Sequence, residues 1–315
     1  MRLAISLCVV PLVCACSLIA EPLTTIAQAQ IIINVVDREG MPITELMQSD
    51  FRVQVNGKAA QAQIQHVEIA SPRIAILLDA SASVTTLQRN WTIARAVAEH
   101  LTYRGRSSRI SLIVFAGRIQ TILDFSRTPE EILSYLDSLK DSGKVLAAGA
   151  DRRTALLDTL NHACTLFGSP LPGDSLFVIT DGGDTRSSVK QFDVERALVS
   201  HGIRFFGLTL PAGTFVTDEE RSGRSMLERF AEVSGGRTIE IADDVSEQGR
   251  AKLTAILDNI YQNVRFCYRL DLPHMEPYKS CRLKIEVLDR KGKRRGDLKL
   301  AYPRDVPCDS GLRRQ

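Results

Sequence analysis

The chain has 315 residues, of which 44% are apolar and 24% are charged, and its formal net charge is only +3. This is the composition of a globular protein with enough apolar residues for a core, and the length predicts one large domain or two modest ones. The small net charge excludes the broad basic surface that a nucleic-acid-binding protein needs, so we expect no nucleic-acid partner.

The first 29 residues have the features of a secretory signal peptide. Arg2 precedes an uncharged apolar stretch, Leu3 to Ile19, and residues 27–29 have the small-x-small pattern of a signal peptidase site. The apolar stretch is too short and too weakly flanked to predict a membrane span. The pattern predicts cleavage before Gln30 and an exported protein, either periplasmic or secreted.

A competing processing pattern lies in the same segment. Residues 13–16 resemble a lipoprotein box in which Cys16 is the lipidated residue, but Cys14 is atypical at the middle position. We therefore rank this interpretation second. Attachment to a membrane is expected only if Cys16 carries a lipid.

Residues 30–71 form a β-rich segment. Ile31 to Val36 is an apolar run that ends in a polar turn, and Phe51 to Val55 alternates with the period of two that is typical of a strand. Asn56-Gly57 then gives a strong hairpin signal, and a third strand is predicted from Ile64 to Glu68.

Residues 72–262 have a different pattern, in which short apolar runs alternate with amphipathic stretches. The run Arg73 to Asp79 is apolar throughout, as expected for a strand buried on both faces of a parallel sheet. Alternation of strands and helices predicts βαβ units, and therefore an α/β domain with a doubly wound, mostly parallel sheet. The segment Pro211 to Gly223 is interpreted as a long polar loop. Predicted helices cover residues 87–101, 129–139, 154–167, 189–200, 225–233 and 245–261, and further strands cover 110–115, 119–125, 175–180, 203–210 and 237–241.

Residues 263–315 return to a strand pattern, with strands predicted at 264–272, 282–287 and 297–302. Neither terminal segment has enough strands for a stable two-layer core of its own. We therefore predict that the N- and C-terminal strands form one accessory β-sandwich, into which the α/β domain is inserted.

Four cysteines follow the predicted signal peptide. Cys164 lies in an apolar helix pattern and is interpreted as a buried free thiol. Cys267, Cys281 and Cys308 allow one disulfide in an exported protein, but the sequence does not fix the pairing. Strand alternation places Cys267 on a polar face and Cys281 on an apolar face, which argues against pairing these two.

Three polar fragments lie at strand ends or at a helix start of the α/β domain. Asp79, Ser81 and Ser83 follow the first sheet strand, Thr154 opens a helix, and Asp181 follows a later strand. Open α/β sheets bind ligands at this edge, near the point where the strand order reverses. Hydroxyl and carboxylate oxygens favour a hard cation, Mg²⁺ or alternatively Mn²⁺ or Ca²⁺, and the absence of His and Cys from the set argues against zinc.

The set Asp79, Ser81, Ser83, Thr154 and Asp181 resembles the metal-ion-dependent adhesion site (MIDAS) of von Willebrand factor type A (VWFA) domains. The resemblance covers about residues 72–262 and implies a Rossmann-like fold. The stretch VVDREGMPITELMQSDFRVQVNGK is also similar to the segment that precedes this domain in many secreted bacterial proteins. Arg152-Arg153 stands where such domains often have Gly-Gly before the threonine, which makes Thr154 the least secure of the five ligands.

The resemblance implies an extracytoplasmic, adhesion-type binding module, in which a partner protein supplies an acidic residue to the metal. It implies binding rather than turnover, so we predict no catalytic residues and no enzyme activity. An alternative is a structural or assembly component of the cell envelope in which the metal site is dispensable. A metal-dependent hydrolase would need a general base near the ion, for which Asp184 is the only nearby candidate.

Overall fold

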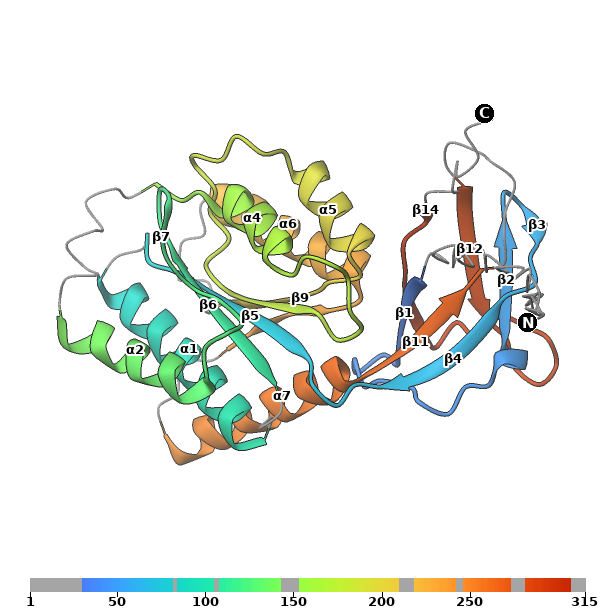
Figure 1. The fold of residues 1–315 in the computed structure, drawn as a ribbon, viewed down its shortest axis with the longest axis horizontal. Helices are drawn as coiled ribbons and strands as arrows, with labels where there is room; N and C mark the ends of the chain where they lie inside the picture. Colours follow the sequence, from blue (N-terminus) through green and yellow to red (C-terminus); the bar gives the residue numbers. More distant parts are fainter. Residues whose placement is uncertain are drawn as a thin grey trace, which may run out of the picture.

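The computed structural model describes residues 30–81, 84–104, 108–142, 153–209, 218–241, 246–272 and 281–306. Within these ranges the chain forms an α/β domain and a β-sandwich that lie side by side (Figure 1). The predicted signal peptide and Ser83 lie outside the described residues. No helix of the described part is both long and apolar enough to cross a membrane.

The α/β domain is built on a six-stranded sheet with the order β10-β9-β8-β5-β6-β7. Neighbouring strands are parallel except β6 and β7, which are antiparallel. The central strand β5 pairs with β6 on one side and β8 on the other, so the strand order reverses between β5 and β8. The strands are β5 (Arg73–Asp79), β6 (Arg109–Phe115), β7 (Ile119–Leu123), β8 (Ser175–Ile179), β9 (Arg204–Thr209) and β10 (Arg237–Glu240).

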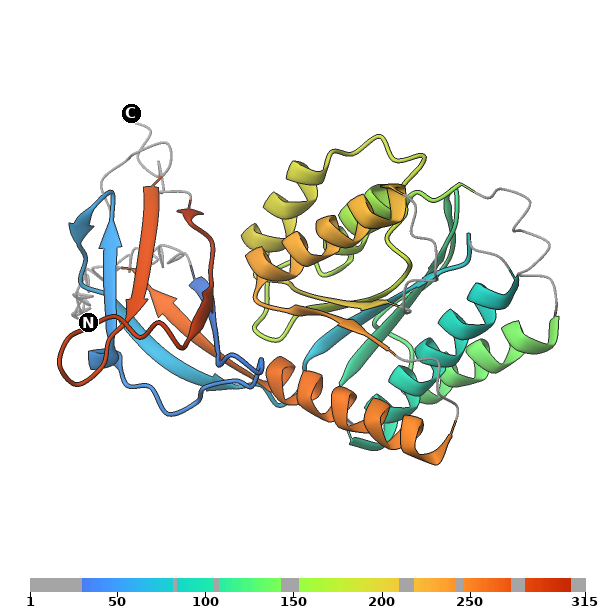
Figure 2. The same ribbon diagram turned by 180° about the vertical axis from the view of Figure 1, so that it is seen from behind.

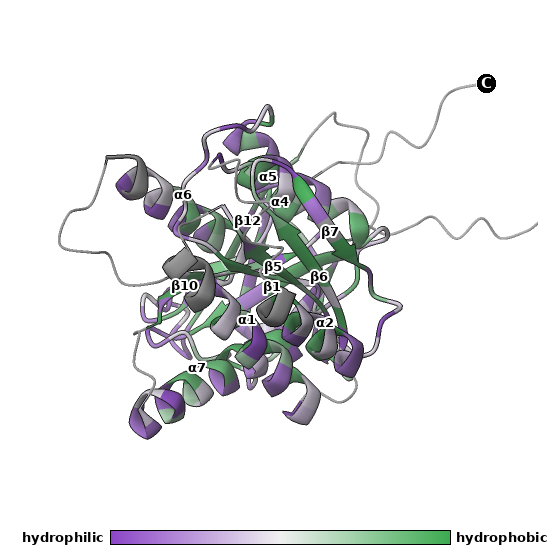
Figure 3. Cartoon of the chain, turned by 90° about the vertical axis from the view of Figure 1, so that its left-hand side faces the viewer, coloured by the Kyte–Doolittle hydropathy of each residue, from purple (hydrophilic) through white to green (hydrophobic). Residues whose placement is uncertain are grey.

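Helices cover both faces of this sheet, which explains why its central strands are almost entirely apolar. Six of the seven residues of β5 are buried. One face packs against α1, α2 and α7, and the other against α4, α5 and α6 (Figures 1 and 3). The helices are α1 (Val84–Arg104), α2 (Pro129–Ser142), α4 (Leu156–Leu166), α5 (Gln191–Ser200), α6 (Asp218–Ser234) and α7 (Glu247–Arg265). The predicted doubly wound α/β fold is confirmed.

The start of α6 differs from the prediction. The sequence analysis placed a polar loop at residues 211–223 and the helix from Ser225, whereas the helix begins at Asp218. Residues 210–217 lie outside the described part. Residues 218–224 lack the apolar periodicity from which a helix is predicted in a sequence.

The β-sandwich consists of two four-stranded sheets, with the orders β13-β1-β11-β4 and β14-β12-β2-β3 (Figure 2). Each sheet contains strands from both ends of the chain, and the apolar faces of the two sheets form one core. The prediction of a single sandwich from N- and C-terminal strands is confirmed. A short 3-10 helix, η1 (Gln48–Asp50), precedes β2, and the strands are β1 (Gln30–Val36), β2 (Phe51–Val55), β3 (Lys58–Ala59), β4 (Gln63–Glu68), β11 (Phe266–Asp271), β12 (Cys281–Val287), β13 (Lys299–Ala301) and β14 (Asp305–Val306).

The chain enters and leaves the α/β domain at one place. β4 leads into β5, and α7 leads into β11 (Figure 1). β4 and β11 are antiparallel neighbours, with Glu68 opposite Phe266. The backbone N–H of Ile69 donates a 2.7 Å hydrogen bond to the carbonyl of Arg265, so entry and exit are in direct contact.

A buried arginine fixes the exit from α7. The Arg204 guanidinium, at the start of β9, donates hydrogen bonds to the carbonyl oxygens of Asn263, of Val264 at 2.7 Å and of Phe266 at 3.1 Å. These carbonyls belong to the last turn of α7 and the first residue of β11, where an α-helix leaves acceptors unsatisfied. Burial lowers the pKa of Arg204 to about 10.

The polar turn after β1 also binds the α/β domain. The carbonyl of Gly40 accepts a hydrogen bond from the side chain of Asn263, and the carbonyl of Glu39 accepts one from Arg237 at 3.1 Å. Gly40 has φ of +82°, and a Cβ there would lie 2.9 Å from the Arg237 guanidinium. The turn therefore joins the sandwich to α7 and β10.

The cysteines behave partly as predicted. Cys164 is a buried free thiol, and burial raises its pKa to about 12. Cys267 is also free, whereas Cys281 is disulfide-bonded, so these two do not pair. The partner of Cys281 lies outside the described residues, as does Cys308. Cys267 is nevertheless buried, with 2% exposure, because the sheet face that carries it packs at the domain junction with Ile32 and Ile69.

Candidate metal centre

Polar side chains gather at the edge of the α/β sheet where β5 and β8 end. Asp79 is the last residue of β5, and Thr180 and Asp181 directly follow β8. Because the strand order reverses between these two strands, their carboxyl ends flank the crevice where open α/β sheets bind ligands. The side chains here are unusually polar for their burial: Asp79 is 1% exposed, and Ser81 and Thr154 are 9% and 6% exposed.

Three of the predicted ligands are in direct contact. The Ser81 hydroxyl donates a 2.6 Å hydrogen bond to Asp79 Oδ1, which also accepts the Ser81 backbone N–H at 2.9 Å. The hydroxyl oxygens of Ser81 and Thr154 are 2.7 Å apart. Ser81 and Thr154 are 73 positions apart in the sequence, yet their hydroxyl oxygens lie within hydrogen-bonding distance of each other. Ser81 also contacts the Asp79 carboxylate.

Thr180, which is not among the predicted ligands, also contributes to this cluster. Its hydroxyl donates a 2.6 Å hydrogen bond to Asp79 Oδ2 and accepts the backbone N–H of Gly182 at 3.1 Å. The amide of Asn90, from α1, donates to the backbone carbonyl of Asp79 at 3.1 Å. Thr180 precedes Asp181 in the sequence, so its position at a strand end was a usable signal.

Backbone hydrogen bonds hold Thr154 in place. Its N–H donates to the Thr185 hydroxyl at 2.9 Å, and its carbonyl accepts the N–H groups of Thr185 and Arg186. The neighbouring Ala155 N–H donates to the Ala116 carbonyl at 2.8 Å, which anchors the same loop next to β6. Thr154 was the least secure predicted ligand, and the structure places it beside Asp79 and Ser81. Arg153 is exposed, and Arg152 lies outside the described residues.

Asp181 lies in a tight loop at the same edge. Its Oδ1 accepts the backbone N–H of Gly183 at 3.0 Å, and its side chain is partly exposed. Gly182 has φ of +96°, and a Cβ on Gly223 of α6 would lie 2.1 Å from the Gly182 carbonyl oxygen. The loop therefore packs backbone to backbone against α6, a contact that requires glycine at both positions.

Among the described residues, no positively charged side chain pairs with the Asp79 carboxylate. Burial raises its pKa to about 6, the hydroxyls of Ser81 and Thr180 act to lower it, and the charge of Asp181 adds to the rise. None of these groups is cationic. Burial without a positive charge nearby destabilises the ionised carboxylate, so a cation bound beside it would be favourable.

Of the five predicted ligands, the structure brings Asp79, Ser81 and Thr154 into contact and places Asp181 close enough to act on the charge of Asp79. Within the described ranges no three His, Cys, Asp or Glu side chains cluster to hold a metal ion. A cation at this edge would thus be held largely by hydroxyl oxygens and water, as the donor set already indicates. Asp184, the candidate base, is used structurally: its Oδ1 accepts the Leu156 N–H at the start of α4 and the Ser187 hydroxyl.

The open α/β sheet and the oxygen cluster at its switch point indicate the family to which this part of the chain belongs. Residues 74–183 match the family model of the von Willebrand factor type A domain. The chain therefore contains a VWFA domain, as the sequence resemblance implied. A search of curated proteins finds no match to the chain.

Several solved structures are similar to part of the chain. Proximal thread matrix protein 1 from the mussel byssus is 16% identical over 62% of this chain and 48% of its own, with a TM-score of 0.44, so the chain spans about half of that protein's length. An aerotolerance-related membrane protein from Bacteroides fragilis is 20% identical over 62% of this chain and 98% of its own, with a TM-score of 0.43. The human COPII-coat protein Sec24c is 9% identical over 78% of this chain and 44% of its own, with a TM-score of 0.40.

Proposed function

We propose that the α/β domain binds a divalent cation, Mg²⁺ or alternatively Mn²⁺ or Ca²⁺, and uses it to bind an acidic residue of a partner protein. VWFA domains generally take part in protein–protein interactions. The observation that carries the metal-dependent form of this function is the contact among Asp79, Ser81 and Thr154 at the switch point of the sheet.

The donor set supports a hard cation. Mg²⁺ prefers six oxygen ligands and commonly keeps several waters, so a few carboxylate and hydroxyl oxygens suffice on the protein side. Asp79, Ser81 and Thr154 supply such oxygens, and we propose Ser83 and Asp181 as the remaining protein ligands. A cation would also compensate the buried charge of Asp79, which no cationic side chain offsets among the groups that shift its pKa.

The charge balance at this edge supports an acidic partner. If some of the carboxylates act through water, the ion keeps net positive charge, and a carboxylate from another protein can complete its coordination. We propose binding rather than catalysis, because the candidate general base Asp184 already accepts hydrogen bonds from Leu156 and Ser187.

The proposed location is outside the cytoplasm, in the periplasm or the medium, with Cys16 as the alternative point of lipid attachment. Besides the signal-like pattern of residues 1–29, the disulfide at Cys281 supports this proposal, since disulfides persist mainly in oxidising compartments.

Isothermal titration of MgCl₂ and MnCl₂ into the metal-free protein tests the metal site. We expect saturable binding that is lost in Asp79→Ala, with Asp193→Ala, an exposed carboxylate on α5, as the matched control. Capture from cell-envelope extract in Mg²⁺, followed by EDTA elution, then tests the partner. A partner that is retained at full strength in EDTA contradicts the metal bridge, and assembly that survives Asp79→Ala favours the structural alternative.

A further inference from the structure

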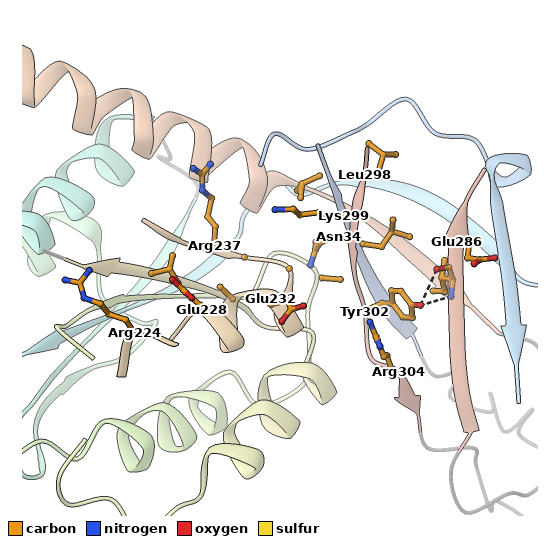
Figure 4. Close-up of a pocket in the computed structure, with 18 of the residues that line it drawn as sticks. Asn34, Arg224, Glu228, Glu232, Arg237, Glu286, Leu298, Lys299, Tyr302 and Arg304 are labelled. Carbon is orange, nitrogen blue, oxygen red and sulfur yellow. Dashed lines mark hydrogen bonds between the residues drawn. The ribbon is translucent and has the colours of Figure 1, made fainter. Parts of the chain in front are cut away.

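A large cleft lies between the two domains. It has a volume of ≈ 720 Å³ and is open to solvent. One wall is formed by α6 and β10 of the α/β domain, and the other by β12, β13 and the residues that follow β13 (Figure 4). Ligand clefts in proteins typically have about 300–1,000 Å³, so the volume is sufficient for a ligand.

Two buried polar atoms of residues that line this cleft have no hydrogen-bond partner in the part of the chain that the structure describes. Asn34 is 5% exposed, and its Oδ1 has no partner, although its Nδ2 donates to the Ser234 carbonyl at 3.3 Å. Thr238 Oγ1, on β10, is also buried without a partner. Such groups are rare because each unsatisfied one costs about 1–3 kcal/mol. Both can accept a hydrogen bond, so the cleft favours a ligand that carries N–H donors.

Two edge strands meet at the same cleft. β10 pairs only with β9 at the end of the six-stranded sheet, and β13 pairs only with β1 at the end of its sheet, among the strands that the structure describes. Residues of both strands line the cleft. An edge strand has unpaired backbone donors and acceptors on one side, which an extended peptide can satisfy by adding a strand.

β12 also lines the cleft, but the backbone groups of its residue Ile285 already have a hydrogen-bond partner. The Tyr302 hydroxyl accepts the N–H of Ile285 at 2.8 Å and lies 3.2 Å from the Ile285 carbonyl (Figure 4). One tyrosine thus satisfies the backbone groups that a further strand would use. The edges available to a ligand are therefore those of β10 and β13.

The floor of the cleft is closely packed, which fixes the distance between its walls. Gly235, after α6, has φ of +82°, and a Cβ there would lie 2.7 Å from the Ala301 side chain and 2.8 Å from that of Asn34. The Asn34–Ser234 hydrogen bond crosses the same contact. The cleft is consequently preformed, and a ligand does not have to order it.

The lining side chains of the two walls carry opposite net charges, with Arg224, Glu228, Glu232, Arg237 and Glu240 on the α6–β10 wall and Glu286, Arg294, Lys299 and Arg304 on the sandwich wall. On the sandwich wall, Lys299 and Arg304 are exposed and have no ion-pair partner among the described residues. On the α6 wall, Glu228 is exposed and likewise unpaired within the described part, and Glu232 forms an ion pair with Arg229 on its own helix. Figure 4 shows the two groups on opposite sides of the cleft. A ligand that matches both walls must carry both charges, on opposite sides.

We propose that this cleft is a second binding site, which takes an extended peptide segment of a partner protein with alternating acidic and basic side chains. Successive side chains of a strand point to opposite sides. Acidic ones then face Lys299 and Arg304, while basic ones face Glu228 and Glu232. The peptide backbone N–H groups supply the donors that Asn34 Oδ1 and Thr238 Oγ1 lack.

Fluorescence anisotropy on the full chain tests this proposal with a fluorescein-labelled hexapeptide of alternating glutamate and lysine. We expect saturable binding, and weaker binding of hexaglutamate and of hexalysine. N-methylation of alternate amides should weaken binding about tenfold, because it removes backbone donors. The double variant Lys299→Glu/Arg304→Glu should weaken binding about five- to tenfold, whereas Lys252→Glu, an exposed control on α7, should leave it unchanged.

Several outcomes would overturn the proposal. These are no saturable binding of the alternating peptide, equal binding of the N-methylated peptide, or equal binding by the double variant when its circular dichroism spectrum is unchanged. Preferential binding of phosphatidylglycerol vesicles over the peptide would also overturn it. Binding should persist in EDTA and in Asp79→Ala, so its outcome is independent of the proposed metal function.

Discussion

The α/β domain and the β-sandwich are built by the chain in opposite ways. The α/β sheet uses one continuous stretch, from β5 to β10, and consecutive elements pack on one another. The sandwich pairs strands from the two ends of the chain, such as Asn34 of β1 with Ala301 of β13. Closing so long a connection costs entropy that only the finished contacts repay. In the folded protein the α/β domain shortens this connection, because its entry and exit are in direct contact.

The two regions also differ in what they bury. The sandwich core consists of apolar side chains, apart from the tyrosine hydroxyl of Tyr268. The α/β domain buries charged groups, namely Asp79 at the metal edge and Asp174 and Arg204 at the junction. Buried charge is costly unless it is paired. Asp174 is paired with Arg73 at 2.6 Å. Among the described residues Asp79 and Arg204 have no ion-pair partner, so these two sites indicate where the structure serves binding or domain attachment.

The largest expected loss of stability follows from replacing Arg204, at the junction of the two regions. Arg204→Met removes the donor for three carbonyls at the end of α7 and the start of β11. Leaving buried acceptors unpaired should destabilise the protein by about 3–5 kcal/mol. Urea unfolding followed by circular dichroism measures this change, with the exposed Arg229→Met as control. A loss under 1 kcal/mol would show that the junction does not depend on this residue.

The next expected effect concerns the disulfide at Cys281, which lies on β12 of the sandwich. Cys281→Ala is expected to lower the free energy of unfolding by about 3 kcal/mol, because the unfolded chain gains entropy. Thermal unfolding with and without reductant measures this. Cys164→Ala in the α/β domain should not change the response to reductant, since that thiol is free. Equal stability of the reduced and oxidised proteins would contradict the prediction.

The contact at Gly235 tests how rigidly the regions are joined. Gly235→Ala combines backbone strain with a clash against Ala301 and Asn34, whereas Gly292→Ala has a similar positive φ but meets no atom within 4 Å. We expect Gly235→Ala to be about 2 kcal/mol more destabilising than Gly292→Ala. Comparison of their melting temperatures isolates the clash. Equal values would mean that the domains can move apart at no cost.

The smallest effect concerns the metal edge. At a tenfold excess of Mg²⁺ over its dissociation constant, binding to the folded state should add about 1.4 kcal/mol to the stability of the α/β domain. Asp79→Asn should lose this increment while retaining its melting temperature in EDTA, since it removes an uncompensated buried charge. Differential scanning calorimetry in Mg²⁺ and in EDTA checks both, with Asp193→Asn as control. An equal increment in Asp79→Asn would place the ion elsewhere.

Much of the fold could be predicted from patterning. The apolar run from Arg73 to Asp79 indicated a strand buried on both faces, and β5 is such a strand. The count of terminal strands was enough to predict the shared sandwich. For the candidate metal centre, strand ends and residue chemistry identified Asp79 and Ser81, and the resemblance to VWFA domains added Thr154. The structure brings these three residues into contact.

The features that were missed depend on contacts between regions distant in sequence. Strand alternation argued against the pair Cys267–Cys281 without fixing the pairing, and it could not show that the face of Cys267 packs at the domain junction with Ile32 and Ile69. Nor could it show that Arg204, in an otherwise apolar strand, reaches the end of α7. The cleft beside Asn34 likewise exists only once the two domains meet. Local patterns predict elements and faces, while tertiary packing decides what covers them.

The place where the chain crosses between domains has an evolutionary consequence. Glu68 of β4 and Phe266 of β11 face each other as antiparallel partners, so the whole of residues 69–265 occupies the position of a β-hairpin loop. Replacing this segment with a two-residue turn would leave eight strands in one continuous chain. A single insertion event between two strands that were already neighbours therefore suffices to derive the present architecture from a simpler ancestor.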